Sequence, residues 1–133
     1  MQVKEIMVRD VATLDVGDEL SLANDIMKLG RIRHLPVVAG TKLVGILSER
    51  DLFRSSLVKA LGHEPSKTRD VMKAVRIQDI MIKNLITISP DADIKEAVQL
   101  MLKYKIGCVP VVQGGELMGL ITETDILMLC LKD

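Results

Sequence analysis

The chain has 133 residues, enough for one compact domain, and its 48% of apolar residues must build an aliphatic core because aromatic residues make up only 2%. Lys plus Arg and Asp plus Glu number 18 each, so the net charge is zero and no overall field attracts a polyanion. This balance weighs against nucleic acid and membrane surfaces as partners, and only one Phe and one Tyr are present to stack on bases.

The expected compartment is the cytoplasm. No apolar run approaches the length of a membrane span. Residues 1–6 lack the apolar stretch of a signal peptide. The two cysteines, Cys108 and Cys130, are too few for a disulfide framework, and both are expected to be small buried hydrophobic residues.

The sequence repeats itself at a constant offset of 74 residues (81 − 7 and 125 − 51). Identical pairs on this register include Met7/Met81, Pro36/Pro110, Gly45/Gly119, Glu49/Glu123 and Asp51/Asp125. Such a tandem repeat usually means two units that pack together, because neither buries its own apolar face. We expect repeat 1 over residues 1–61, a linker with a short helix over 62–75, and repeat 2 over 76–133.

Both copies open in the same way, with a short segment (3–9 and 77–83), a β-type run (11–14 and 85–88) and a helix. Pro90 indicates the first turn of the second-copy helix, where its missing N–H costs nothing. Gly30 is expected to end the first-copy helix. The apolar stripes predicted for these helices are Leu22, Ile26 and Leu29, beside Ala23 and Met27, in one copy and Ile94, Ala97, Val98 and Met101 in the other.

Two apolar runs around a glycine-containing turn then predict a β-hairpin in each copy, over 35–47 and 109–121. These runs are continuously apolar, so the sheets should be covered on both faces or paired with each other. A second helix begins at Ser48 and at Thr122. The first of these helices is expected to reach residue 61, with another over 68–74. The fold class is therefore α/β (α+β), with the order β-α-β-β-α repeated twice.

The tetrapeptides that begin these second helices are the sharpest local pattern. Ser48 and Asp51, like Thr122 and Asp125, are spaced as a capping box, which by itself explains them. The same geometry also suits a ligand, because a carboxylate on the first helical turn can accept both hydroxyls of a ribose and the hydroxyl can meet a phosphate. Both interpretations remain open at this point.

The residues before the hairpins differ between the copies. Arg33 and His34 precede Pro36 and either form an exposed loop or bind a phosphate, Arg through its planar fork and His as a pH-dependent donor. Gly107 and Cys108 replace them before Pro110. The two halves are therefore not chemically equivalent.

No constellation for catalysis or metal binding emerges. His34 and His63 show no ligand spacing. The sequence has no phosphate-binding loop of the nucleoside-triphosphatase type and no dinucleotide fingerprint. We therefore expect no enzyme activity, no metal and no required cofactor.

The doubled pattern of strand with Thr, helix, hydrophobic-Pro-Val-Val, Gly-hydrophobic-hydrophobic and Ser/Thr-x-x-Asp resembles the cystathionine-β-synthase (CBS) domain, and two copies resemble a CBS pair, or Bateman module. The resemblance covers almost the whole chain apart from residues 53–75. The string 31–38 is similar to stand-alone bacterial and archaeal CBS proteins, including the acetoin-utilisation type.

The resemblance implies two β-α-β-β-α repeats packed sheet to sheet with pseudo-two-fold symmetry, and clefts that bind AMP, ADP, ATP or S-adenosylmethionine. It implies that Thr13 and Thr87 mark the strands that meet the base, and that Asp51 and Asp125 bind the ribose with Ser48 and Thr122. It also places Arg33 and His34 on the phosphate side, before Pro36. In the second copy Gly107 and Cys108, before Pro110, depart from this pattern; either Lys103 or Lys105 compensates, or that cleft holds a less charged ligand or none.

Together these patterns predict a non-catalytic sensor that passes occupancy to a partner protein or an oligomer interface, most simply a homodimer through the apolar C-terminal helix. The alternative is a structural dimerisation module with no small-molecule ligand. In that case Asp51 and Asp125 would serve only as helix caps.

Overall fold

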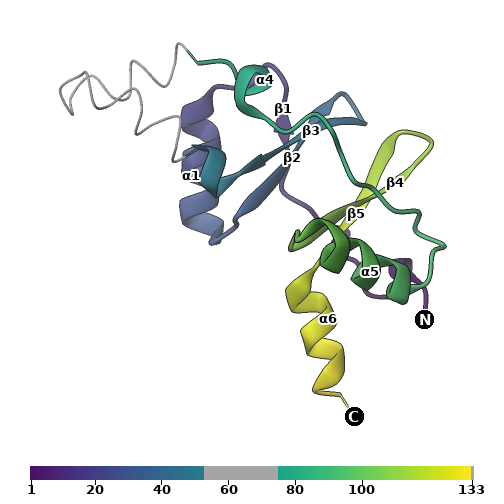
Figure 1. Ribbon diagram of the computed structural model, residues 1–133. Coiled ribbons are helices and arrows are strands. Elements are labelled where there is room, and N and C mark those ends of the chain that lie inside the picture. The colour runs from purple at the N-terminus through teal and green to yellow at the C-terminus, as the bar shows by residue number, and fades with distance from the viewer. Residues whose placement is uncertain (53–74, 133) are drawn as a thin grey trace. The chain divides into compact units, whose positions relative to one another are not determined.

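The computed structural model describes residues 1–52 and 75–132 (Figure 1). The predicted helical extension to residue 61, the linker and the helix over 68–74 lie outside the described residues. In chain order the elements are η1 (Val3–Glu5), β1 (Leu14–Asp15), α1 (Leu20–Gly30), β2 (His34–Ala39), β3 (Lys42–Ser48), α4 (Ile77–Ile80), α5 (Ile94–Tyr104), β4 (Cys108–Gln113), β5 (Glu116–Thr122) and α6 (Glu123–Cys130). Residues 49–52 are also helical. The fold is α+β, and both predicted hairpins are confirmed.

The chain divides into two compact units that differ from the sequence repeats. The β2–β3 unit consists of residues 12–40 and 44–85, and the β4–β5 unit of residues 1–11, 41–43 and 86–133. Each unit therefore holds one hairpin together with the opening segment of the other repeat.

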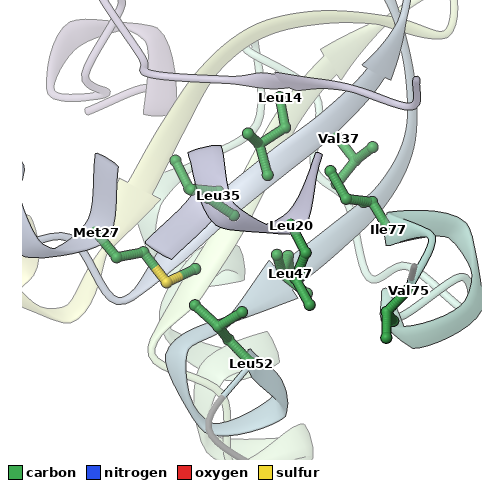
Figure 2. Packing of buried hydrophobic residues seen from close by; sticks show 10 residues of the cluster. Leu14, Leu20, Met27, Leu35, Val37, Leu47, Leu52, Val75 and Ile77 are labelled. Carbon is green, nitrogen blue, oxygen red and sulfur yellow. The ribbon is translucent and has the colours of Figure 1, made fainter. Parts of the chain in front are cut away.

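In the β2–β3 unit, β1 pairs with β2 in parallel, with Leu14 opposite Val37, and α1 packs on β2. Figure 2 shows the aliphatic side chains of this unit gathered between helix and strands. The cluster consists of Leu14, Leu20, Ala23, Met27, Leu35, Val37, Leu47, Leu52, Val75 and Ile77. Burial of this apolar surface is the main force that holds the unit together.

The β4–β5 unit repeats these contacts 74 residues later. Ile88 bridges to Val111 in parallel, as Leu14 does to Val37, and α5 packs on β4. The antiparallel β4–β5 ladder places Cys108 opposite Thr122. Its cluster consists of Val3, Met7, Ile88, Ala97, Met101, Val109, Val111 and Ile121.

The opening segments are exchanged between the repeats. Val3 joins the core of the β4–β5 unit, and its repeat mate Ile77 joins the core of the β2–β3 unit; both are fully buried. The isolated bridges follow the same rule: Val8 pairs with Leu120 and Ile82 with Ile46, while Gln2 pairs with Asp93 and Arg76 with Glu19. Each core is thus completed by residues from the other sequence repeat.

This exchange explains why glycine stands at the same position of both repeats, at Gly45 and Gly119. A Cβ built on Gly119 would lie 2.7 Å from the Val8 carbonyl oxygen and 2.8 Å from the Met7 sulfur. A Cβ on Gly45 would collide with Met81 in the same manner and lie 3.2 Å from the Ile82 carbonyl oxygen. Glycine lets the exchanged segment approach the strand closely.

Two details of the helices differ from the sequence-based expectation. Pro90 lies in a turn and does not begin a helix; α5 begins after Asp93, whose side chain accepts a hydrogen bond of 2.9 Å from the Lys95 N–H. The Asp93 carboxylate supplies the cap that α5 needs, so the helix starts there. The Pro90 carbonyl instead accepts a hydrogen bond from Lys4.

The predicted apolar stripe of α1 was wrong at Leu22 and Leu29, whereas Ile26 packs against the core. Leu20, Ala23 and Met27 are its buried residues, whereas Leu22 is 42% exposed and Leu29 is 88% exposed. The buried set follows an i, i+3, i+7 spacing that begins at the first helical residue. Gly30 is the last residue of α1, but the left-handed residue after the helix is Arg31, with φ 52°. Ala97 and Met101 of α5 are buried as expected.

Candidate ligand-binding site

In the β2–β3 unit, Ser48 at the end of β3 is hydrogen-bonded to Asp51. The Ser48 hydroxyl donates to Asp51 Oδ2 at 2.7 Å and accepts from the Asp51 N–H at 3.0 Å. Both residues are half-buried. The hydroxyl therefore fixes the orientation of the carboxylate beside the start of the next helix.

Thr122 and Asp125 form the same arrangement at the start of α6. Asp125 Oδ2 accepts from the Thr122 N–H at 2.8 Å and from the Thr122 hydroxyl at 3.0 Å, and the Asp125 N–H donates to Thr122 Oγ1 at 3.3 Å. This is a complete capping box. The structural role that the sequence suggested for this pair is therefore real.

Capping uses only half of each carboxylate. In the described part of the chain, all hydrogen bonds to Asp51 and Asp125 from side chains and backbone amides reach Oδ2. Oδ1 keeps both of its lone pairs for an external donor. A fixed, half-buried carboxylate oxygen of this kind can accept hydrogen bonds from the hydroxyls of a ribose.

The residues before each hairpin are held against these helix starts. The Glu49 N–H donates to the Arg33 carbonyl at 2.7 Å, and the Glu123 N–H donates to the Gly107 carbonyl at 2.9 Å. Arg33 and His34 thus lie beside Ser48 and Asp51, as Gly107 and Cys108 lie beside Thr122 and Asp125. The Arg33 side chain is exposed and makes no ion pair with any residue that the structure describes.

The remaining predicted residues are two threonines, which lie next to strand pairings, and two prolines, which lie within strands β2 and β4. Thr13 is exposed and directly precedes β1, which pairs with the strand that contains Pro36. Thr87 is exposed and precedes Ile88, whose N–H donates to the Pro110 carbonyl at 3.1 Å. Pro36 and Pro110 are fully buried. Within each unit, the Thr therefore precedes a residue that pairs with the Pro-containing strand, and the hairpin begun by that strand leads into the Ser/Thr–Asp pair.

We define the β2–β3 half-site and the β4–β5 half-site by these residues. The β2–β3 half-site consists of Thr13, Arg33, His34, Pro36, Ser48 and Asp51. The β4–β5 half-site consists of Thr87, Gly107, Cys108, Pro110, Thr122 and Asp125.

The two cysteines have different environments. Cys108 is buried at the start of β4, and burial raises its pKa from 9.0 to about 12, with a further contribution from the Asp125 carboxylate. It is therefore a neutral thiol at neutral pH, as predicted. Cys130 was predicted to be buried, but it lies exposed on α6, which has no buried residue. The thiol of Cys130 donates a hydrogen bond to the Ile126 carbonyl of its own helix, at 3.8 Å.

Glu123 is a residue of this region that the sequence interpretation did not single out. A Cβ built on Gly107 would lie 3.1 Å from both Cδ and Oε1 of Glu123. The Glu123 carboxylate therefore occupies the space beside Gly107 where any other residue would carry its side chain. The one signal in the sequence was that glutamate stands at the same position of both repeats, as Glu49 and Glu123. It did not show that Glu123 would lie beside Gly107.

Lys103 and Lys105 were named from the sequence as residues that could replace the arginine missing at Gly107. Neither has a contact with Gly107 among those described. Lys103 Nζ lies over the Tyr104 ring, 5.2 Å from its centroid, in a cation–π contact within α5. Lys105 is the exposed left-handed residue that follows α5, with φ 53°.

Over residues 1–52 and 75–132, no group of three or more His, Cys, Asp or Glu side chains is placed to hold a metal ion. No helix in that part of the chain has the length and apolar character needed to cross a membrane.

Two α+β units with exchanged opening segments and equivalent Ser/Thr–Asp pairs define a tandem-repeat protein with paired candidate half-sites. The CBS domain family matches residues 3–58 and 77–132, so the chain belongs to the CBS domain family and carries two CBS domains. The predicted family is confirmed.

Solved structures agree over the full length. A candidate acetoin utilization protein (AcuB) from Vibrio cholerae is 32% identical, with a TM-score of 0.83, over 99% of this chain and 91% of the other. The CBS domain pair of protein MJ0100, in complex with 5′-methylthioadenosine and S-adenosyl-L-methionine, is 30% identical, with a TM-score of 0.76, over 98% of this chain and 99% of the other.

Curated relatives include whole enzymes that match only in part. The inosine-5′-monophosphate dehydrogenase of Korarchaeum cryptofilum is 35% identical over 92% of this chain, but the match spans only 23% of the enzyme. The similarity therefore concerns a minor part of that dehydrogenase.

Proposed function

We propose that this CBS pair is a non-catalytic regulatory module that binds an adenosine-containing ligand through its two half-sites. The ligand is AMP, ADP, ATP or S-adenosylmethionine, and no cofactor is required. The observation that carries the proposal is the likeness to the MJ0100 CBS pair, which is 30% identical over nearly the whole of both chains and forms a complex with two adenosine compounds.

The geometry of the half-sites supports the same ligand class. Asp51 and Asp125 each keep one carboxylate oxygen for the hydroxyls of a ribose, and each is oriented by a hydroxyl, from Ser48 or Thr122. In the β2–β3 half-site the Arg33 guanidinium can donate hydrogen bonds to a phosphate through its planar fork. Thr13 and Thr87 lead into the strands on which the adenine would lie.

Ligand occupancy would act by shifting the population of two conformations with different affinities. We propose that the change is passed to a partner protein or to a second copy of the chain. A homodimer is supported by α6, where Leu127, Met128 and the following Leu131 are 64%, 53% and 80% exposed. Light scattering at micromolar concentration tests this, and a monomer there would contradict it.

A thermal-shift panel with AMP, ADP, ATP, S-adenosylmethionine, NAD and GTP tests ligand binding directly. A ligand at about 100 times its Kd adds roughly 2.7 kcal/mol to the free energy of unfolding. We expect a selective response to an adenosyl compound that is reduced in Asp51→Ala and in Asp125→Ala. Loss of the caps alone lowers stability by roughly 0.5–2 kcal/mol without ligand, so the ligand-dependent increment is the quantity to compare.

A flat response in the panel would favour the alternative, a structural dimerisation module. In that case the aspartates would be helix caps only. The light-scattering experiment would then still report a dimer.

A further inference from the structure

The two half-sites carry different charges at equivalent positions. In the β2–β3 half-site, position 33 is an exposed arginine that forms no ion pair with the described residues. In the β4–β5 half-site, the equivalent position is Gly107, and the carboxylate of Glu123 lies in the space beside it. A positive group in one half-site is thus matched by a negative group in the other.

Neither Glu123 nor Asp125 forms an ion pair with the residues that the structure describes. Cys108 takes the place of His34 and is a buried, neutral thiol. Asp125 brings a second carboxylate within the same turn of α6. Lys103 is engaged with Tyr104 in α5.

We propose that Glu123 excludes phosphate from the β4–β5 half-site, which accepts adenosine compounds whose 5′ substituent is uncharged or cationic. The proposal rests on the proposed function, because it assigns a ligand class to one of the two half-sites. A phosphate group carries a charge of about −1.5 to −2 at neutral pH. Two carboxylates at close range repel it, and within the described residues neither of them forms an ion pair that would offset its charge.

The backbone of Gly107 positions the Glu123 side chain. The Glu123 N–H donates a hydrogen bond to the Gly107 carbonyl at 2.9 Å. This bond holds the first residue of α6 against the residue that precedes β4. Because Gly107 has no Cβ, the Glu123 side chain can lie across it. In the other repeat, the Glu49 N–H makes the same hydrogen bond to the Arg33 carbonyl. Arg33 stands at the position equivalent to Gly107, and its side chain supplies a positive charge there.

The test compares AMP with 5′-methylthioadenosine, which share adenosine and differ at the 5′ position, by isothermal titration of the full chain at pH 7.5. Asp51→Ala removes the ribose acceptor of the β2–β3 half-site and leaves the β4–β5 half-site to report. In this background we expect 5′-methylthioadenosine to bind at least about ten-fold more tightly than AMP. Adding Glu123→Gln should reduce that ratio by about five-fold or more, mainly through tighter binding of AMP.

Glu49→Gln in the same background is the matched control, and it should leave the ratio within about two-fold. Unfolding curves of every variant establish that it is folded before titration. Equal or tighter binding of AMP in Asp51→Ala, loss of 5′-methylthioadenosine binding there, or a ratio that Glu123→Gln leaves unchanged would each overturn the proposal.

The failure of the proposed function looks different. If neither compound binds the wild-type chain, the adenosyl-binding function falls, and the assignment of the half-site falls with it. A second outcome is that 5′-methylthioadenosine binds, Asp125→Asn weakens its binding, and Glu123→Gln leaves the ratio of the two affinities unchanged. The proposed function then stands, and only the exclusion of phosphate is wrong.

Discussion

Val8 and Leu120 exchange two backbone hydrogen bonds, with the Val8 N–H at 2.8 Å and the Leu120 N–H at 2.9 Å from the partner carbonyl. Ile82 and Ile46 do the same at 2.7 Å and 3.0 Å in the other unit. These bonds attach the opening segment of each repeat to the hairpin of the other. The first predictions test this exchange.

Gly119→Ala should lower the free energy of unfolding by about 1–3 kcal/mol, because the new methyl group would meet the Val8 carbonyl at 2.7 Å. Gly45→Ala should act similarly through Met81 and Ile82. Urea unfolding measures both changes. A loss below about 0.5 kcal/mol in both variants would show that the segments do not approach the strands this closely.

Ile77→Ala should cost about 2–5 kcal/mol, because its fully buried side chain belongs to the core of the β2–β3 unit. Leu29→Ala is the control, since Leu29 is 88% exposed and should change stability by no more than about 0.5 kcal/mol. Equilibrium denaturation of both variants gives the comparison. Similar effects at the two positions would contradict the assignment of buried and exposed residues.

Cys108 should make stability fall at alkaline pH. Burial raises its pKa from 9.0 to about 12, so between these values the folded chain keeps a proton that the unfolded chain has lost. The contribution is fully present below pH 9 and disappears as the pH rises toward 12. Cys108→Ala should flatten this slope whatever its effect on stability at pH 7, whereas Cys130→Ser should leave it unchanged.

Lys105→Gly should raise stability by about 0.5–1 kcal/mol, because Lys105 has φ 53° in the left-handed region that glycine adopts without penalty. Lys103→Gly, inside α5, should lower it by about 1 kcal/mol. Both variants remove one positive charge, but only Lys105→Gly relieves a left-handed backbone conformation. Comparing their thermal unfolding therefore separates the effect of backbone strain from the effect of lost charge. A decrease for Lys105→Gly would contradict the strain.

Much of the fold follows from local chemistry that the sequence displays. Gly40 and Gly114 adopt positive φ in the hairpin turns, where the apolar runs on either side had predicted them. The Ser48–Asp51 and Thr122–Asp125 spacing predicted the hydrogen bonds that both pairs make. These features depend on residues within a few positions of each other.

The exchange of segments could not be predicted in the same way. Val3 and Ile77 have the same apolar character and the same position in the repeat, so either could complete either core. The contact between Gly107 and Glu123 was equally hidden, because a glycine gives no sign of which side chain will lie beside it. Both depend on distant parts of the chain meeting in three dimensions.

The exchange also sets an order for folding during synthesis. Residues 12–85 form one continuous stretch that contains the whole β2–β3 unit, so its core partners have all been made once Leu85 is added. Val3 and Met7 are translated before this stretch, yet their core also needs Ile121, which is translated after it. A growing chain therefore completes the β2–β3 unit first. The apolar segment that carries Val3 and Met7 must wait until β5 has been made.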